Sequence, residues 1–69
     1  MNKPPRITAT VKFYNEQKGY GFLTLVDGRD LFVHASQIVE HEPLQSGQRV
    51  SCIEDRGTKG PIARQVVRI

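Results

Sequence analysis

The residues best suited to chemistry in this chain lie between Lys18 and Ser36, where ring-bearing side chains recur at alternate positions. The segment KGYGFLTL is followed by the turn VDGR and then by DLFVHAS. Alternate side chains of a strand share one face, so this hairpin is predicted to have an aliphatic face and an aromatic face. The aromatic face carries Tyr20, Phe22, Phe32 and His34, with Lys18 at its edge.

Stacking on nucleobases is the chemistry that this aromatic face predicts. Small domains rarely leave contiguous apolar patches exposed without a function. Flat rings can stack on any unpaired base, which gives binding with little sequence preference. Lysines at positions 12, 18 and 59 would contact phosphates and make the affinity fall as salt rises. The alternative is ordinary core packing of the rings, but the opposite face already supplies apolar side chains for a small core: Leu23, Leu25, Leu31 and Val33.

The polar residues of the same stretch do not favour catalysis. His34 has no convergent acid, nucleophile or second ligand in the sequence, so it supports neither a catalytic nor a metal site. Stacking on a base, with some hydrogen bonding, is the better interpretation. Asp30 repels phosphates, and two roles remain open for it: accepting a hydrogen bond from a base edge, or capping the turn beside Gly28.

Composition limits the class of protein. The chain has 69 residues, enough for one domain spanning residues 1–69, with residues 1–6 expected to form a frayed lead-in. Its single cysteine excludes an internal disulfide, and Cys52 is expected to be a small buried residue, with a reactive thiol as the alternative. We expect no signal peptide, no membrane span and no cofactor, and we expect a cytoplasmic location. The net charge of +3 favours a polyanionic partner only weakly.

Short strands must position these side chains. The alternation over residues 7–14 predicts a strand in which Phe13 and Tyr14 fall on opposite faces, unless a bulge brings both to one side. Asp27-Gly28 predicts a hairpin turn, with the next strand starting near Asp30. Residues 37–48 are predicted to form a loop, with one helical turn near residues 35–39.

Two later strands are predicted with irregularities. A strand over residues 49–54 would place Val50 and Cys52 inward, but it must then either end by Ile53 or contain a bulge. Residues 62–69 are predicted to form an irregular strand. Ala63, Val66 and Ile69 recur at every third position there, but a capless helix of this length would be marginal alone. Five short strands and no convincing helix indicate a small all-β barrel or sandwich.

Five segments in order, VKFYN, KGYGFL, DLFVHAS, GQRVS and KGPIARQV, closely resemble the cold-shock domain and cover about residues 10–69. The resemblance implies an all-β, five-stranded antiparallel barrel of the OB type that binds single-stranded RNA and DNA. Carried over position by position, it implies a binding surface of Lys12, Phe13, Tyr14, Lys18, Tyr20, Phe22, Asp30, Phe32 and His34, with Lys59 and Pro61 in a further contact loop.

This chain also departs from the family's usual pattern. The family usually has tryptophan at the position of Phe13, phenylalanine at Tyr14 and Tyr20, and an aromatic residue at Ala35. The loop over residues 37–48 is shorter and lacks an aromatic residue often found there. The departures imply a smaller stacking surface, for which Arg29, Arg56 or Arg64 would have to compensate.

The function predicted from the sequence is therefore binding of single-stranded RNA and DNA with low specificity, in the role of an RNA chaperone or a regulator of transcription or translation under stress. The protein is expected to be a monomer, not an enzyme, and to use no metal and no small-molecule substrate. The alternative is a small β-barrel protein-interaction module that binds a peptide on the same aromatic face. A nuclease is a weaker alternative, because the chain shows neither a convincing carboxylate cluster nor a histidine pair.

Overall fold

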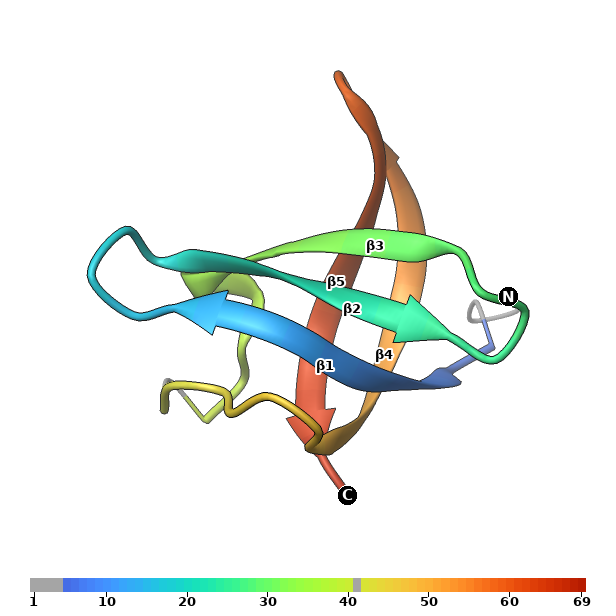
Figure 1. Ribbon diagram of the computed structural model, residues 1–69. Coiled ribbons are helices and arrows are strands. Elements are labelled where there is room, and N and C mark those ends of the chain that lie inside the picture. Colours follow the sequence, from blue (N-terminus) through green and yellow to red (C-terminus); the bar gives the residue numbers. More distant parts are fainter. Residues whose placement is uncertain (1–4, 41) are drawn as a thin grey trace.

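The computed structural model describes residues 5–40 and 42–69, and in these residues five strands close into a barrel (Figure 1). The strands are β1 (Ile7–Asn15), β2 (Tyr20–Leu25), β3 (Asp30–His34), β4 (Arg49–Gly57) and β5 (Gly60–Arg68), and a single 3₁₀ turn, η1 (Ala35–Gln37), follows β3. Their order around the barrel is β1-β2-β3-β5-β4, with β4 adjacent to β1. The predicted OB-type barrel, its hairpin turn and the helical turn near residue 35 are confirmed.

The pairing is not purely antiparallel, which corrects one part of the sequence prediction. β3 and β5 run parallel where Phe32 lies beside Ile62, whereas the other four neighbouring pairs are antiparallel. The reason is the odd number of strands. If each strand reverses direction relative to its neighbour around a ring of five, the last pair must point the same way. Closure removes open edges that would otherwise recruit other strands.

A bulge in β1 decides which way Phe13 and Tyr14 face. Val11 pairs with Leu23 and Phe13 with Phe22, so a two-residue step in β1 matches one residue in β2 and Lys12 is the extra residue. Past the bulge, Phe13 shares the outer face with Phe22, and Tyr14 lies beside Gly21 on the inner side, partly packed against the core. The two rings therefore stay on opposite faces of the sheet, but the bulge puts Phe13 on the outer face and Tyr14 on the inner one, the reverse of regular alternation from Val11.

The irregularity in the second half of the chain lies in β5. The step from Ser51 to Ile53 in β4 matches the longer step from Val67 to Arg64 in β5. Within that step Gln65 adopts a positive φ of 51°. This extra residue explains why Ala63 and Val66 are both buried although they are three apart. β4 itself continues regularly to Gly57, three residues beyond the predicted end, and the β4–β5 hairpin projects from the barrel (Figure 1).

The core is entirely hydrophobic. Its largest fully buried side chains are Val11, Leu23, Leu31, Val33, Val50, Cys52 and Val66. Cys52 is thus the small buried residue expected, and burial raises the pKa of its thiol. Residues 38 and 44 of the long loop also enter the core, and Val39 N–H donates to Val66 O at 2.9 Å.

The start of the described chain is attached to the barrel. Residues 1–4 of the predicted lead-in lie outside the described residues. Arg6 donates from Nε to Ser51 Oγ at 2.8 Å and from Nη2 to the carbonyls of Ser51 and Gln65. The guanidinium therefore connects the start of β1 to β4 and to the irregular step of β5.

Candidate nucleic-acid interface

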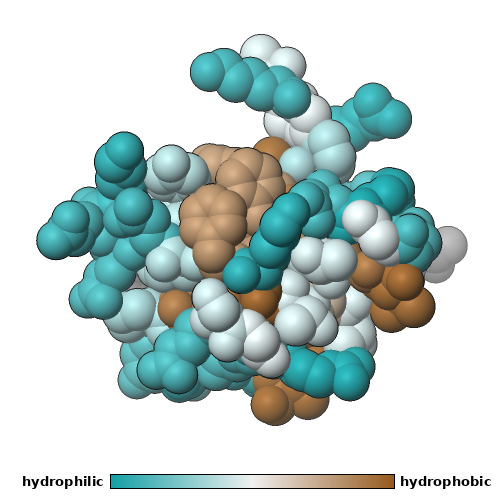
Figure 2. Space-filling model, viewed as in Figure 1, coloured by the Kyte–Doolittle hydropathy of each residue, from teal (hydrophilic) through white to brown (hydrophobic). Residues whose placement is uncertain are grey.

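The outer face of β1, β2 and β3 carries aromatic rings in cross-strand register. Phe13, Phe22 and Phe32 form one row across the three strands, and Tyr20 and His34 form the next row. We call Phe13, Tyr20, Phe22 and Phe32 the platform. In Figure 2 hydrophobic side chains gather over β2 and β3, and hydrophilic ones surround them. Four of the predicted stacking residues are therefore brought together on one surface.

Contacts between neighbouring rings hold the platform in shape. The centroids of Phe13 and Phe22 are 5.5 Å apart, and those of Phe22 and Phe32 are 5.7 Å apart with the rings at 74°. Tyr20 and Phe32 lie 5.7 Å apart at 28°, close to a stacked arrangement. These separations are in the range where aromatic pairs stabilise each other. Phe13 is the most open of the four, with 42% of its surface exposed.

Gly21 makes this arrangement possible. A Cβ atom at position 21 would lie 2.3 Å from the carbonyl oxygen of Phe13 and 2.8 Å from Tyr14 Cα. Only glycine lets the backbone of β1 approach β2 so closely.

Tyr14 lies apart from the other rings. Its ring is on the inner side of β1, next to Gly21, and partial burial together with nearby Glu16 raises the pKa of its phenol. No ring contact joins it to the platform among the described aromatic pairs. The structure thus separates it from the other predicted site residues.

Lys12 and Asp30 form an ion pair at the edge of the platform. Lys12 Nζ lies 3.0 Å from Asp30 Oδ2, and Thr24 Oγ1 donates to Asp30 Oδ1 at 3.1 Å. The Lys12 ammonium holds the pKa of the Asp30 carboxyl below its usual range, with a smaller contribution from Thr24. The turn itself is capped by Asp27, whose Oδ1 accepts from Arg29 N–H at 3.1 Å. Asp30 is therefore bound to side chains on the face and does not cap the turn.

His34 is oriented by the 3₁₀ turn that follows it. Its Nδ1 accepts a hydrogen bond from the backbone N–H of Ser36 at 3.1 Å and lies 2.9 Å from Ser36 Oγ. A nitrogen that accepts carries no proton, so the neutral ring has its proton on Nε2 and offers a donor there. The exposed ring stands beside Tyr20 and provides both a flat face and a donor.

A groove separates the platform from the β4–β5 hairpin. Its volume is about 620 Å³, within the size range of ligand sites. One wall is made by Phe22, Asp30 and Phe32, and the other by residues 57–62, which include Lys59 and Pro61. The further contact loop predicted from the sequence therefore faces the aromatic strand face across a shared groove. Ile62 also lines it and was missed by the sequence analysis, although its position after Gly-Pro was a usable signal.

The cations around this surface differ in how they are engaged. Lys18 lies in the turn between β1 and β2, where its backbone N–H donates to Asn15 Oδ1 at 2.9 Å. Within residues 5–40 and 42–69, no carboxylate lies within 4 Å of the Lys18 or Lys59 ammonium. These two lysines are available to an anionic ligand, whereas the Lys12 ammonium already forms an ion pair with Asp30.

No metal-binding or membrane-spanning feature stands out in the described part of the chain. It contains no group of three or more His, Cys, Asp or Glu side chains able to hold a metal ion. It also contains no helix long and apolar enough to cross a membrane.

A small closed β-barrel with aromatic side chains on adjacent strands and lysines at their edge belongs to the class of OB-type nucleic-acid-binding barrels. Residues 7–69 match the family described as the 'Cold-shock' DNA-binding domain. The chain is 49% identical over 63 residues to cold shock protein CapB of Pseudomonas syringae pv. tomato, covering 88% of this chain and 91% of that protein.

Two further relatives agree. Cold shock protein CspV of Vibrio cholerae is 46% identical over 67 residues, covering 93% of this chain and 96% of that protein. Cold shock protein 1 of Lactiplantibacillus plantarum is 47% identical over 60 residues, with coverages of 84% and 91%. The chain therefore belongs to the cold-shock domain family, as its motifs predicted. It is a nucleic-acid-binding domain of the stress response and not an enzyme.

Proposed function

We propose that this protein binds single-stranded RNA and DNA with little sequence preference by stacking unpaired bases on the platform. The observation that carries the proposal is the cross-strand register of Phe13, Phe22 and Phe32, which places three rings side by side on an outer face. Each stacked base is worth about 1–3 kcal/mol by alanine substitution. The aliphatic core is complete without these rings.

Around the platform, the proposed surface includes His34, the Lys12–Asp30 pair, and the groove wall of Lys59 and Pro61. His34 offers a flat face and a donor, and Lys18 and Lys59 supply charge for phosphates. Asp30 accepts a hydrogen bond from a base edge in exchange for its contact with Thr24. Tyr14 is left out of this surface because its ring lies on the inner side of β1.

The same mode of binding gives an RNA chaperone activity. A ligand that binds only the unpaired state of an RNA strand shifts the equilibrium toward that state by mass action. Low specificity allows many transcripts to be kept open, and no catalytic group is required. We propose that the protein acts in this way in the cytoplasm as a monomer. Its lone, buried cysteine fits a reducing compartment.

A salt titration tests the proposal. Fluorescence anisotropy of labelled oligothymidylate and single-stranded RNA should show binding whose log–log salt slope is about −0.7 per neutralised phosphate. Duplexes of the same length should bind much more weakly. A protein-interaction module using the same rings would show little binding or little salt dependence. Opening of a quenched RNA hairpin by the protein would test the chaperone role, and failure to open it despite strand binding would contradict that role alone.

A further inference from the structure

A polar row crosses the same sheet next to the platform. On the outer face, Arg49 of β4 pairs with Thr10 of β1, Thr10 with Thr24 of β2, and Thr24 with Asp30 of β3. Because side chains of one face recur every second residue, Thr24 lies about 7 Å along β2 from Phe22. The polar row therefore lies next to the row of Phe13, Phe22 and Phe32, and it extends one strand further, to β4.

A small hollow lies along this row. Its volume is about 110 Å³, and its walls include Thr8, Thr10, Thr24 and Arg49. Pockets for whole small molecules begin at about 300 Å³, so the hollow is too small for a stacked base and has no ring to stack on. Hydroxyl groups and a guanidinium are suited instead to a compact anion with several oxygen acceptors.

Arg49 differs from most other arginines of the described chain. Arg29, Arg64 and Arg68 each form ion pairs with aspartate or glutamate. Arg49 is exposed, and no carboxylate of residues 5–40 or 42–69 lies within 4 Å of its guanidinium. The charge at the other end of the row, Asp30, is already offset by Lys12. The β4 end of the row is therefore the positive end.

We propose that Arg49, Thr10 and the hollow beside them form a phosphate site that receives the nucleic-acid backbone where it leaves the platform. Arg49 contributes charge-assisted hydrogen bonds to phosphate oxygens, and the threonine hydroxyl adds a neutral donor. The site rests on the proposed function and lengthens the binding track beyond the rings and the β4–β5 hairpin. It adds affinity without sequence preference, since a phosphate carries no base identity.

The test uses two oligothymidylates, one of about four nucleotides that covers only the platform and one of about eight that extends past it. Arg49→Gln should leave the short oligonucleotide's affinity unchanged. It should weaken the long one about threefold at low salt and reduce its salt slope by about 0.7. Arg49→Lys should restore the slope. Amide signals of Thr10 and Arg49 should shift on titration with the long strand only.

Arg64→Gln is the matched control, because it removes the same charge from β5 outside the row. Equal losses for Arg49→Gln and Arg64→Gln, or equal losses on short and long strands, would overturn the site in favour of a general charge effect. An unchanged slope for Arg49→Gln would also overturn it. If the parent protein binds neither strand, the proposed function itself fails. If the parent binds both and Arg49→Gln has no effect, only the phosphate site fails.

Discussion

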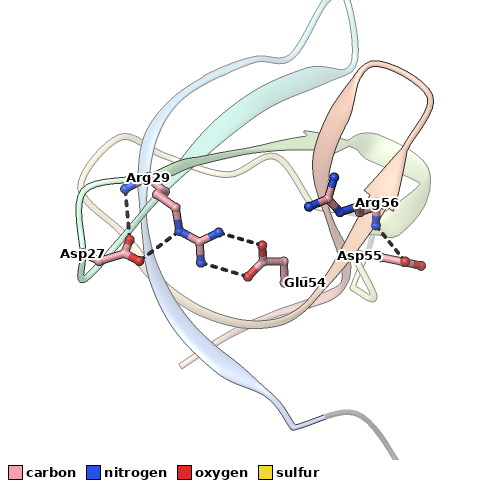
Figure 3. Close-up of polar contacts among 5 residues, drawn as sticks. All are labelled: Asp27, Arg29, Glu54, Asp55 and Arg56. Atoms are coloured by element: carbon pink, nitrogen blue, oxygen red, sulfur yellow. Dashed lines mark hydrogen bonds and ion pairs between the residues drawn. The ribbon is translucent and has the colours of Figure 1, made fainter.

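Two surfaces of this barrel use their charged residues in opposite ways. On the platform side, the rings lie on the outer face, exposed or half-buried, and two nearby lysines have no carboxylate within ion-pair distance in the described chain. On the side formed by the β2–β3 turn and β4, the exposed side chain of Arg29 is paired with two carboxylates. Its guanidinium makes two bonds to Glu54, at 3.0 and 3.1 Å, and a third to Asp27 at 2.9 Å (Figure 3). We call this group the Arg29 clamp.

The difference shows that net charge is a poor guide to where a polyanion binds. Arginines outnumber the free lysines near the rings, but three of the six are paired with carboxylates that hold the β2–β3 turn, the β4–β5 hairpin and the long loop in place. Arg56 is an exception. Its backbone N–H donates to Asp55, while its side chain points away from that residue (Figure 3). Of the three arginines expected to compensate for the smaller platform, Arg56 is thus the one without an ion pair in the described chain.

The largest effect is expected from breaking the scaffold of the platform with Gly21→Ala. The added methyl group collides with the backbone of β1, which cannot yield as a side chain can. We expect a loss of stability of at least about 1–3 kcal/mol, measured by chemical denaturation, together with weaker strand binding. Gly57→Ala is the control, because its methyl group would meet mainly a side chain, Ile62, at 2.9 Å. Equal destabilisation by both changes would contradict the special role of Gly21.

Removing one ring should weaken binding while sparing the fold. Phe32 contacts both Tyr20 and Phe22 at the centre of the platform, so Phe32→Ala removes a stacking surface worth about 1–3 kcal/mol, or about 5- to 150-fold in affinity. Anisotropy titration with oligothymidylate measures it. Val39→Ala is the control, because it shortens an apolar side chain that is 53% exposed and lines neither the groove nor the hollow, and it should change nothing. Parent-like binding by Phe32→Ala would show that bases do not stack there.

The contrast between free and paired cations is sharpened by two single-charge changes. Lys59→Gln should lower the salt slope of strand binding by about 0.7, because one phosphate contact is lost. Arg64 is held by Asp55 at 2.9 Å, so Arg64→Gln should leave the slope nearly unchanged. If the two variants gave the same salt slope, the proposed distinction between cations free for a ligand and cations paired with carboxylates would be wrong.

The smallest effect concerns the Arg29 clamp. Arg29→Gln should leave strand affinity unchanged and lower stability slightly, and molar salt should reduce the difference because exposed ion pairs are screened. The Arg29 backbone N–H and then its side chain hold the pKa of Asp27 below its usual range. A carboxyl with a depressed pKa stabilises the fold at pH values above its unfolded-state pKa. That contribution is lost as the pH falls through the folded-state pKa.

The parent should therefore lose its advantage over Arg29→Gln below the ordinary aspartate range. Denaturation midpoints measured for both proteins from neutral pH to acid would show this convergence. A stability difference that stays constant into acid would contradict the assigned partners.

Much of this molecule could be predicted from its sequence, because alternation and turn residues carry local information. Leu23 and Phe22 were assigned to opposite faces correctly, and Asp27-Gly28 marked the turn. That one neighbouring pair is parallel could also have been predicted, because an odd number of strands cannot close a ring with antiparallel pairs alone. Which pair it is, β3 with β5, depends on the strand order around the barrel. The positions of Phe13 and Tyr14 could not, since a bulge after Val11 depends on how the backbone of β1 meets Gly21.

The partners of the charged side chains also lay beyond the sequence. Arg29 and Glu54 are 25 residues apart, and nothing local indicates that they meet. Lys12 and Asp30 come together only because β1 and β3 both flank β2. Which cations remain for a ligand is therefore a property of the closed barrel.

The groove beside the platform also relates strand binding to the order in which the chain assembles. β1, β2 and β3 are joined by short turns, as are β4 and β5, whereas the β3–β5 and β1–β4 junctions close over longer stretches of chain. Contacts between distant segments form late, because their loop-closure entropy must be overcome first. Phe32 and Ile62 meet at the β3–β5 junction, and both line the groove. A strand lying in the groove spans one of these two long-range joints, so bound nucleic acid should slow the opening of the barrel itself.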